Sequence, residues 1–268
     1  MDFRGDALEI LKQTSRTFYI PISLLPKELR RAVASAYLCM RAIDEIEDHD
    51  LLDNQTKAKL LRQISLELQS QSSIGNNSNL AHCLHPYKEI LPEVSLRIGE
   101  WSNLSSETIA PRIWDATAAM ADRMAHWATV NWRIETVADL DAYTFSVAGA
   151  VGLMLSDIWA WYDGTTTNRA HAIGFGRGLQ TVNIIRNRAE DLSRGADFFP
   201  DGWQTRDMQE YARSQLQLGQ LYTNALSKSP ALDFCRIPLA LAFATLDAIA
   251  LGKEKLSRSE ELSVVNNF

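Results

Sequence analysis

KELRRAVASAYLCMRAIDEIED, from Lys27 to Asp48, repeats apolar residues and alanine at the spacing of one buried face of an α-helix. The stretch follows Pro26, a residue type that is common where helices begin. Its last turns are acidic, and Asp44, Glu47 and Asp48 stand at i, i+3 and i+4, where side chains share one face. Like charges at this spacing destabilise an isolated helix, so we expect something to compensate them.

The rest of the chain has the composition of a helical protein. Only 13 glycines and 8 prolines occur in 268 residues, and 46% of the residues are apolar, so the frequent turns of an all-β sandwich are missing. The polar stretches 69–80 and 163–168 are expected to be loops rather than interdomain linkers. We therefore predict an all-α fold in one domain spanning residues 1–268. Three further segments have clear helical periodicity: 111–130, 136–161 and 169–192.

Charge and cysteine content limit the function classes. Lysine and arginine number 27 against 33 acidic residues, which gives a formal charge of −6 and argues against a nucleic-acid-binding protein. Cys39, Cys83 and Cys235 are widely spaced and indicate free thiols in a reducing compartment. The first residues lack a signal-peptide pattern, and the apolar stretch 237–251 is too short to span a bilayer. We expect a cytoplasmic protein with at most peripheral contact with the inner face of the membrane.

The acidic end of the first helix is a candidate metal site. A solvated helix face is the simpler interpretation of a single D-x-x-x-D pattern. Here, however, Asp44 and Asp48 end an otherwise apolar helix, and Arg41 precedes them on the same face. Oxygen ligands suit magnesium, which commonly bridges protein carboxylates and substrate phosphates. The five histidines form no i,i+4 pair that would favour a softer metal.

A second patch in the other half of the chain echoes the first. Asn187, Glu190 and Asp191 again fall at i, i+3 and i+4 of a predicted helix. The neighbouring Arg186 and Arg188 either neutralise the carboxylates or hold phosphate oxygens. Two such patches with their arginines would suit a diphosphate.

Two further features stand out in the second half. Gln180 and Asn183 extend the polar face of the helix that carries the second patch, and amides on an apolar helix require hydrogen-bond partners. In the preceding helical segment, the small residues from Ala148 to Gly152 indicate either close helix contacts or room beside a ligand.

Four ordered motifs carry a family resemblance: SRTF at 15–18, RAIDEIED at 41–48, YTFSVAGAVG at 143–152 and LQTVNIIRNRAED at 179–191. Together they resemble the motifs of the squalene/phytoene synthase family, the head-to-head isoprenyl diphosphate synthases. The resemblance covers most of the chain, because DFFP and RIPLALAFATLDAI, further on, are similar to the later segments of that family.

The resemblance implies a single-domain helical bundle of the isoprenoid synthase type with a central active-site cavity. It implies magnesium-dependent condensation of two prenyl diphosphates, with farnesyl diphosphate as the expected substrate. The reaction would pass through a cyclopropyl intermediate to a squalene- or dehydrosqualene-type product. NADPH is needed for squalene alone, and the sequence does not indicate it, since GFGRG at 174–178 lies in a helical pattern.

The resemblance also implies roles for individual residues, for each of which ordinary helix packing or capping is the alternative. The expected magnesium ligands are Asp44, Asp48, Asn187, Glu190 and Asp191. The expected catalytic residues are two arginines that contact diphosphate and a tyrosine that orients the leaving diphosphate: Arg41, Arg186 and Tyr143. The remaining substrate-binding residues are expected to anchor diphosphate or line the cavity: Ser15, Phe18, Phe145, Gln180 and Asn183.

One position departs from the family pattern. Asn187 stands where the second motif normally begins with aspartate, and an amide is a weaker magnesium ligand than a carboxylate. The site either assembles through the remaining ligands, or it supports one ionisation, the loss of diphosphate from one substrate, without the full condensation. Two enzyme alternatives follow from Asn187, namely hydrolysis of a prenyl diphosphate to its alcohol and prenyl transfer to an aromatic acceptor. A separate alternative is a non-catalytic helical binding protein.

Overall fold

The structure is a computed structural model that describes residues 5–75, 78–226, 229–253 and 256–265. Throughout these residues the secondary structure is helical, with no strand, so the predicted all-α fold is confirmed. Contacts group the chain into two compact units, Met1–Asn131 and Trp132–Phe268, and each is described by itself. One domain over residues 1–268 stays a prediction.

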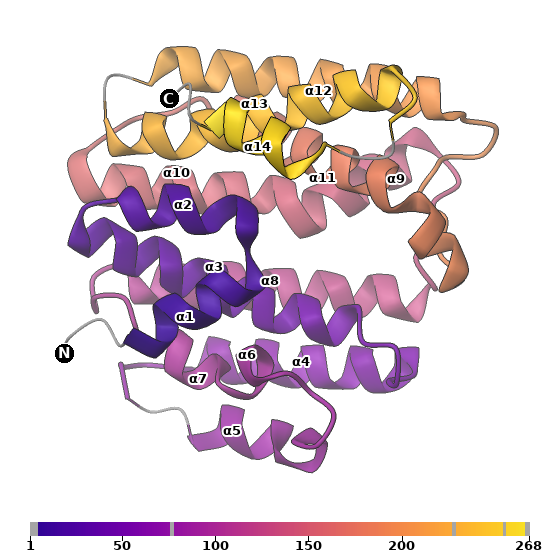
Figure 1. Ribbon diagram of the computed structural model, residues 1–268. Coiled ribbons are helices and arrows are strands. Elements are labelled where there is room, and N and C mark those ends of the chain that lie inside the picture. Colours follow the sequence, from indigo (N-terminus) through magenta and orange to yellow (C-terminus); the bar gives the residue numbers. More distant parts are fainter. Residues whose placement is uncertain (1–4, 76–77, 227–228, 254–255, 266–268) are drawn as a thin grey trace. The chain divides into compact units, whose positions relative to one another are not determined.

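The first unit is built around three long helices. α4 packs along α8, and α3 packs against both (Figure 1). The predicted helices 27–48 and 111–130 correspond to α3 and α8, whereas the predicted loop 69–80 is shorter because α4 runs to Ser70 and α5 begins at Ser78. The helices of this unit are α1 Gly5–Thr14, α2 Arg16–Leu24, α3 Lys27–Glu47, α4 Asn54–Ser70, α5 Ser78–Leu84, η1 His85–Tyr87, α6 Glu93–Leu96, α7 Ile98–Trp101 and α8 Ala110–Thr129.

The core of the first unit contains polar side chains whose hydrogen bonds are satisfied. Ser35 and Ser95 are fully buried, and burying a hydroxyl without a partner would be costly. The Ser35 Oγ donates to the Trp101 carbonyl at 2.7 Å, and the Ser95 Oγ donates to the Ala42 carbonyl at 2.8 Å. These bonds fix α3 against the short helices α6 and α7.

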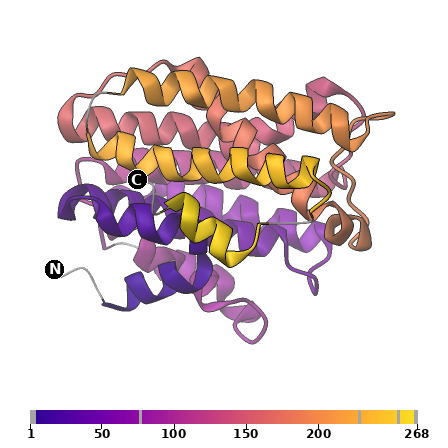
Figure 2. The same cartoon turned by 45° about the horizontal axis from the view of Figure 1, so that its top comes forward.

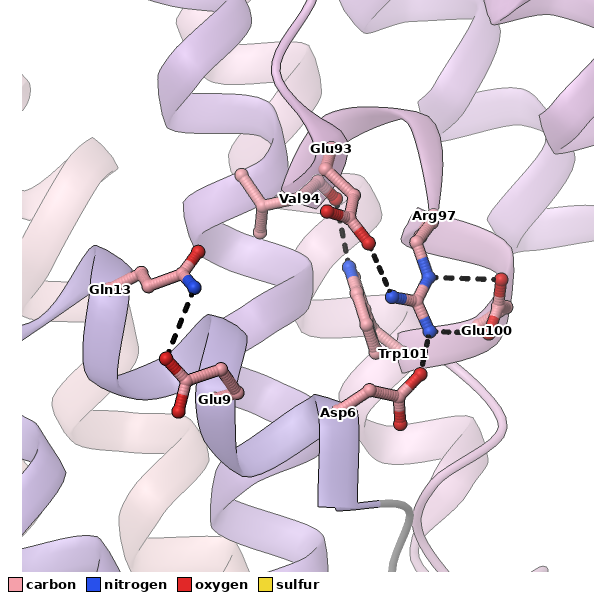
Figure 3. Close-up of polar contacts among 8 residues, drawn as sticks. All are labelled: Asp6, Glu9, Gln13, Glu93, Val94, Arg97, Glu100 and Trp101. Atoms are coloured by element: carbon pink, nitrogen blue, oxygen red, sulfur yellow. Dashed lines mark hydrogen bonds and ion pairs between the residues drawn. The ribbon is translucent and has the colours of Figure 1, made fainter.

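A single arginine joins the N-terminal helix to those short helices. Arg97 forms ion pairs with Glu93 and Glu100 of its own segment and with Asp6 of α1 (Figure 3). Its guanidinium carbon lies 4.4 Å from the ring centroid of Trp101, in the geometry of a cation–π contact. Arg97 therefore links α1 to a tryptophan of the unit's core.

The second unit is organised around the pairing of α11 with α12. α13 packs beside both, and α14 contacts α13 (Figure 2). The predicted segment 169–192 corresponds to α11, and the predicted segment 136–161 consists of α9, η2 and α10 in succession. The helices of this unit are α9 Val137–Thr144, the π-helix η2 Phe145–Gly149, α10 Ala150–Asp163, α11 Arg169–Ser193, α12 Thr205–Ala225, α13 Pro230–Ala250 and α14 Arg258–Val265.

The helix boundaries of this unit follow from local capping chemistry. Thr136 and Asp139 form a capping box at the start of α9. Gly164 ends α10 in the left-handed region at φ 77°, which glycine adopts without strain. Asn168 then caps α11 by accepting a hydrogen bond from the His171 amide. The predicted loop 163–168 is therefore confirmed, apart from its first residue.

Small residues let the backbones of two helices touch. A Cβ at Gly152 would collide with the carbonyl of Ala172, and a Cβ at Gly176 would collide with that of Ala148. These contacts fix η2 and α10 against α11. Of the two sequence interpretations of this small-residue segment, close helix contact is the one that the structure supports.

One continuous helical stretch, 137–163, is long and apolar enough to cross a membrane by length and composition alone, with a mean hydropathy of 1.2. The sequence prediction considered only the apolar stretch 237–251 and missed this one. In its most apolar 18-residue segment, 39% of the residues are buried, and its glycines pack on α11. Peripheral membrane contact and a cytoplasmic location stay predictions.

Candidate functional site

The C-terminal end of α3 gathers charged side chains around one arginine. Arg41 Nη1 donates to Asp44 Oδ2 at 2.6 Å, and Arg41 Nη2 donates to Glu45. Asp48 is exposed at the end of the helix. Glu47, the third acidic residue of the predicted patch, is only 4% exposed.

The electrostatics of this end fit a divalent cation. Partial burial and the negative charge of Asp48 raise the pKa of Asp44 to about 7, although the Arg41 guanidinium acts in the opposite direction. The carboxyl groups of Asp44, Glu45 and Asp48 lie at this end with one guanidinium, that of Arg41, and carboxylate oxygens are the ligands that magnesium prefers. In the described part of the chain no three His, Cys, Asp or Glu side chains converge on one point within a unit. The donor chemistry of Asp44 and Asp48 fits magnesium.

Arg41 also has unused hydrogen-bonding capacity. Its Nε is buried and has no hydrogen-bond acceptor among the described residues. A buried donor without an acceptor is unfavourable, and a diphosphate oxygen would supply one.

The N-terminal SRTF motif lies beside the acidic end of α3 in the first unit. Ser15 caps α2, because its Oγ accepts a hydrogen bond from the Phe18 amide at 2.9 Å. Tyr37 of α3 donates its hydroxyl to the Thr14 carbonyl at 3.1 Å, and its ring centroid lies 5.9 Å from that of Phe18. The unit thus brings together the predicted residues Ser15, Phe18, Arg41 and Asp44.

Tyr37 is the residue that connects this group, although it was not among the predicted site residues. Burial raises the pKa of its hydroxyl, the negative charge of Asp44 adds to this, and the hydrogen bond to Ser15 together with the Arg41 charge opposes it. Its position one turn before Arg41, on the same helical face, was the available signal in the sequence.

In the second unit, Asp191 lies near the end of α11 with 8% of its surface exposed. Burial raises the pKa of its carboxyl, while the hydrogen bond that Arg194 Nη2 donates to Asp191 Oδ1 at 2.8 Å opposes this. Glu190 is exposed. The amide oxygen of Asn187 accepts a hydrogen bond from the Nε of Arg186 at 3.2 Å. The two residues are thus oriented together at the position where the family pattern has an aspartate.

The polar face of α11 is accessible to water. Gln180 is half-buried and Asn183 is exposed, so their amides avoid the cost of burial without partners. Phe145 begins the π-helix η2, next to the glycines that contact α11.

Arg188 has a structural role. Its Nη2 donates to Asp197 Oδ2 at 2.9 Å, and its guanidinium carbon lies 3.7 Å from the ring centroid of Phe199. The sequence left open whether this arginine neutralises a carboxylate or holds phosphate oxygens. The structure shows it paired with a carboxylate, that of Asp197, in the loop that follows α11. The family-like DFFP segment contains both partners of this arginine.

Tyr143 is 6% exposed and stacks on Phe198, with ring centroids 4.6 Å apart and an interplanar angle of 19°. Phe198 was not among the predicted site residues. The only signal for it in the sequence was its place in DFFP, and no periodicity relates that segment to Tyr143. A stacked partner for a candidate catalytic tyrosine is thus a finding of the structure.

Comparison with known proteins identifies the family. The family model for squalene/phytoene synthase matches residues 11–208 of the 268-residue chain. The chain belongs to the squalene/phytoene synthase family. The matched region includes all the predicted site residues of both units.

Two relatives within the squalene/phytoene synthase family share about 30% of their aligned residues with this chain. The squalene synthase of Schizosaccharomyces pombe is 29% identical over 272 residues, which cover 90% of this chain and 58% of the relative. That of Rattus norvegicus is 30% identical over 266 residues, which cover 89% and 62%. The chain thus spans less than two thirds of the length of these relatives.

A solved structure supports the family fold. The complex of TcSQS with the ligand BPH1237 matches with a TM-score of 0.79 at 22% identity, covering 97% of this chain and 84% of that one. At this identity the likeness concerns the fold. The predicted helical fold of the isoprenoid synthase type is confirmed.

Proposed function

We propose that this chain is a magnesium-dependent prenyltransferase that condenses two prenyl diphosphates, with farnesyl diphosphate as substrate, head to head. The family match over residues 11–208 carries the proposal. The relatives compared above are named squalene synthases, which favours condensation over the alternatives of hydrolysis or prenyl transfer to an aromatic acceptor.

The proposed metal ligands divide between the two units. Asp44 and Asp48 would contribute from α3, and Glu190 and Asp191 from α11, with the amide oxygen of Asn187 as a weaker ligand. Magnesium, when bound, would stabilise the negative charge that develops on the departing diphosphate. The charges at the end of α3 support the assignment, because Asp44 and Glu45 share one arginine, Arg41, and Asp48 adds a further negative charge beside Asp44.

The arginines are proposed to bind the diphosphate groups directly. Arg41 has a buried Nε without an acceptor in the described part of the chain, and Arg186 is exposed on α11. Each would donate charge-assisted hydrogen bonds to phosphate oxygens. Ser15 would help to anchor diphosphate beside Arg41, and Gln180 and Asn183 would bind substrate from α11.

The organic chemistry requires a water-free cavity. In the proposed first half, the allylic carbon–oxygen bond of one substrate breaks and diphosphate leaves. The double bond of the second substrate attacks the cation, and loss of a proton closes a cyclopropane ring. Tyr143 would orient the leaving diphosphate, while Phe18 and Phe145 would stabilise positive charge through their ring faces.

In the proposed second half, the remaining diphosphate of the cyclopropyl intermediate departs and the ring rearranges. Hydride from NADPH would then give a squalene-type product, and loss of a proton would give a dehydrosqualene-type product. Comparing the products formed with and without NADPH decides between these two outcomes.

The test is incubation of the purified protein with radiolabelled farnesyl diphosphate, with and without magnesium, followed by separation of the products. A thirty-carbon hydrocarbon or its cyclopropyl precursor, formed only with magnesium, is the expected result. Farnesol as the main product would instead identify a hydrolase. No consumption of substrate under any metal condition would refute both activities and leave a binding protein.

A further inference from the structure

The loop between α11 and α12, residues 194–204, is attached to the second unit at both ends. At its start, the backbone N–H groups of Arg194 and Ala196 both donate to the Asp191 carbonyl at 3.0 Å. Toward its end, the Asp201 N–H donates to the Glu135 carbonyl at 2.9 Å, just before α9 begins. The loop therefore follows a fixed path from the acidic end of α11 to the start of α9.

The middle of the loop is fixed by Arg188. Besides its ion pair with Asp197, this guanidinium lies over the ring of Phe199, which is only 5% exposed. Asp197 Oδ1 in turn accepts a hydrogen bond from the Phe199 N–H at 3.1 Å. These contacts hold the backbone of the two adjacent phenylalanines in one conformation, with Phe199 serving as the buried anchor.

Phe198 has different surroundings from its neighbour. It is partly exposed, and its ring stacks on that of Tyr143 at the centroid distance given above, within the range of favourable aromatic pairs. A phenol ring with one face covered by a fixed partner is restricted in rotation about its side-chain bonds, so the position of its hydroxyl is restricted as well.

We infer that Phe198 is a positioning residue for Tyr143. The inference rests on the proposed function, in which the Tyr143 hydroxyl orients the leaving diphosphate. The chain of contacts runs from the Asp191 backbone through the loop to Phe198 and from there to Tyr143. Phe198 acts through the tyrosine alone, and a hydroxyl displaced by a fraction of an ångström would lower the rate of the chemical step.

Three variants separate positioning from packing. Phe198→Leu keeps an apolar side chain but removes the stacking ring, Phe198→Tyr keeps the ring, and Phe199→Leu is the matched control in the same loop. For Phe198→Leu we expect kcat for farnesyl diphosphate consumption to fall about three- to tenfold, with KM changed less than about twofold. Phe198→Tyr should restore kcat. Phe199→Leu should lower the thermal unfolding temperature, and because leucine still provides a buried apolar anchor for the loop, kcat should fall by less than in Phe198→Leu.

A double-mutant cycle tests whether the effect passes through the tyrosine. Tyr143→Phe removes the hydroxyl and keeps the ring, so Phe198→Leu should cause no further loss of kcat in that background. If the fold-losses of kcat in the two single variants multiply in the double variant, the inference is overturned. So would an unchanged kcat in Phe198→Leu, or an equal loss in Phe199→Leu measured below its unfolding temperature.

A spectroscopic measurement keeps this inference separate from the proposed function. In protein labelled with 3-fluorotyrosine, the fluorine resonance of Tyr143, assigned by its loss in Tyr143→Phe, should shift in Phe198→Leu and return in Phe198→Tyr. An unshifted resonance overturns the positioning role. If the parent protein does not consume farnesyl diphosphate, the proposed function is refuted, and the fluorine shift still decides whether Phe198 fixes the ring.

Discussion

Replacing Arg97 by methionine should lower the free energy of unfolding by about 2 kcal/mol, because its guanidinium joins α1 to the short helices α6 and α7. Methionine retains much of the aliphatic packing and removes the charge. The lost contacts are the ion pairs with Asp6, Glu93 and Glu100 and the cation–π contact with Trp101 (Figure 3).

The magnitude follows from the exposure of each partner. The three carboxylate side chains are 42–60% exposed, so solvent screening limits each pair to about 0.2–1 kcal/mol. Arg97 itself is 19% exposed and sits over an indole, which adds about 0.5–1 kcal/mol. A loss of about 2 kcal/mol corresponds to a fall of about 4–8 °C in the unfolding temperature of a protein of this size.

Urea unfolding followed by circular dichroism measures the change, and Arg206→Met is the matched control. Arg206 makes a single pair with Glu210, with side chains 87% and 65% exposed, so its loss should change stability by less than about 0.5 kcal/mol. High salt should reduce the Arg97→Met effect without abolishing it, since salt screens the ion pairs more than the stacking on Trp101. If Arg97→Met costs no more than Arg206→Met, the reasoning is refuted.

Three further predictions concern the proposed chemistry and the helix contact. Asp48→Ala should abolish consumption of radiolabelled farnesyl diphosphate without a large change in unfolding temperature, because Asp48 is exposed; full turnover would remove it from the mechanism. Gly152→Val should destabilise the protein by about 1–3 kcal/mol in urea unfolding, because its Cβ would meet the Ala172 carbonyl, and parental stability would contradict this close approach. Asn187→Asp should lower the magnesium concentration needed for half-maximal turnover, and an unchanged requirement would argue against position 187 as a ligand.

The long helices could be predicted from the sequence because their determinants are local. α3 follows Pro26 and has an apolar face of the right period, and its observed end lies one residue from the predicted one. α11 was likewise predicted to within one residue, because the loop before it contains the capping residue Asn168. The family resemblance similarly rested on contiguous motifs, which the match over residues 11–208 confirms.

The features that the sequence did not predict depend on contacts between distant residues. The π-helix Phe145–Gly149 interrupts a stretch whose periodicity is that of an ordinary α-helix. The burial of Glu47 depends on the side chains that pack against the end of α3, and the residue type alone favours exposure. The stack of Phe198 on Tyr143 joins residues 55 positions apart in the chain. Charge and helical spacing carry no information about such a pair.

The close backbone contacts of η2 and α10 with α11 have a consequence for engineering. Directed evolution of product chain length would usually begin with the small residues of a helix that is proposed to line the cavity, since enlarging them is the simplest way to shorten a pocket. Gly152 and Gly176 are unsuitable for this purpose, because any side chain there meets the carbonyl of the other helix. A productive library would leave both glycines unchanged and vary Phe18 and Phe145. Selection for altered products should therefore yield substitutions at the aromatic positions and almost none at the two glycines.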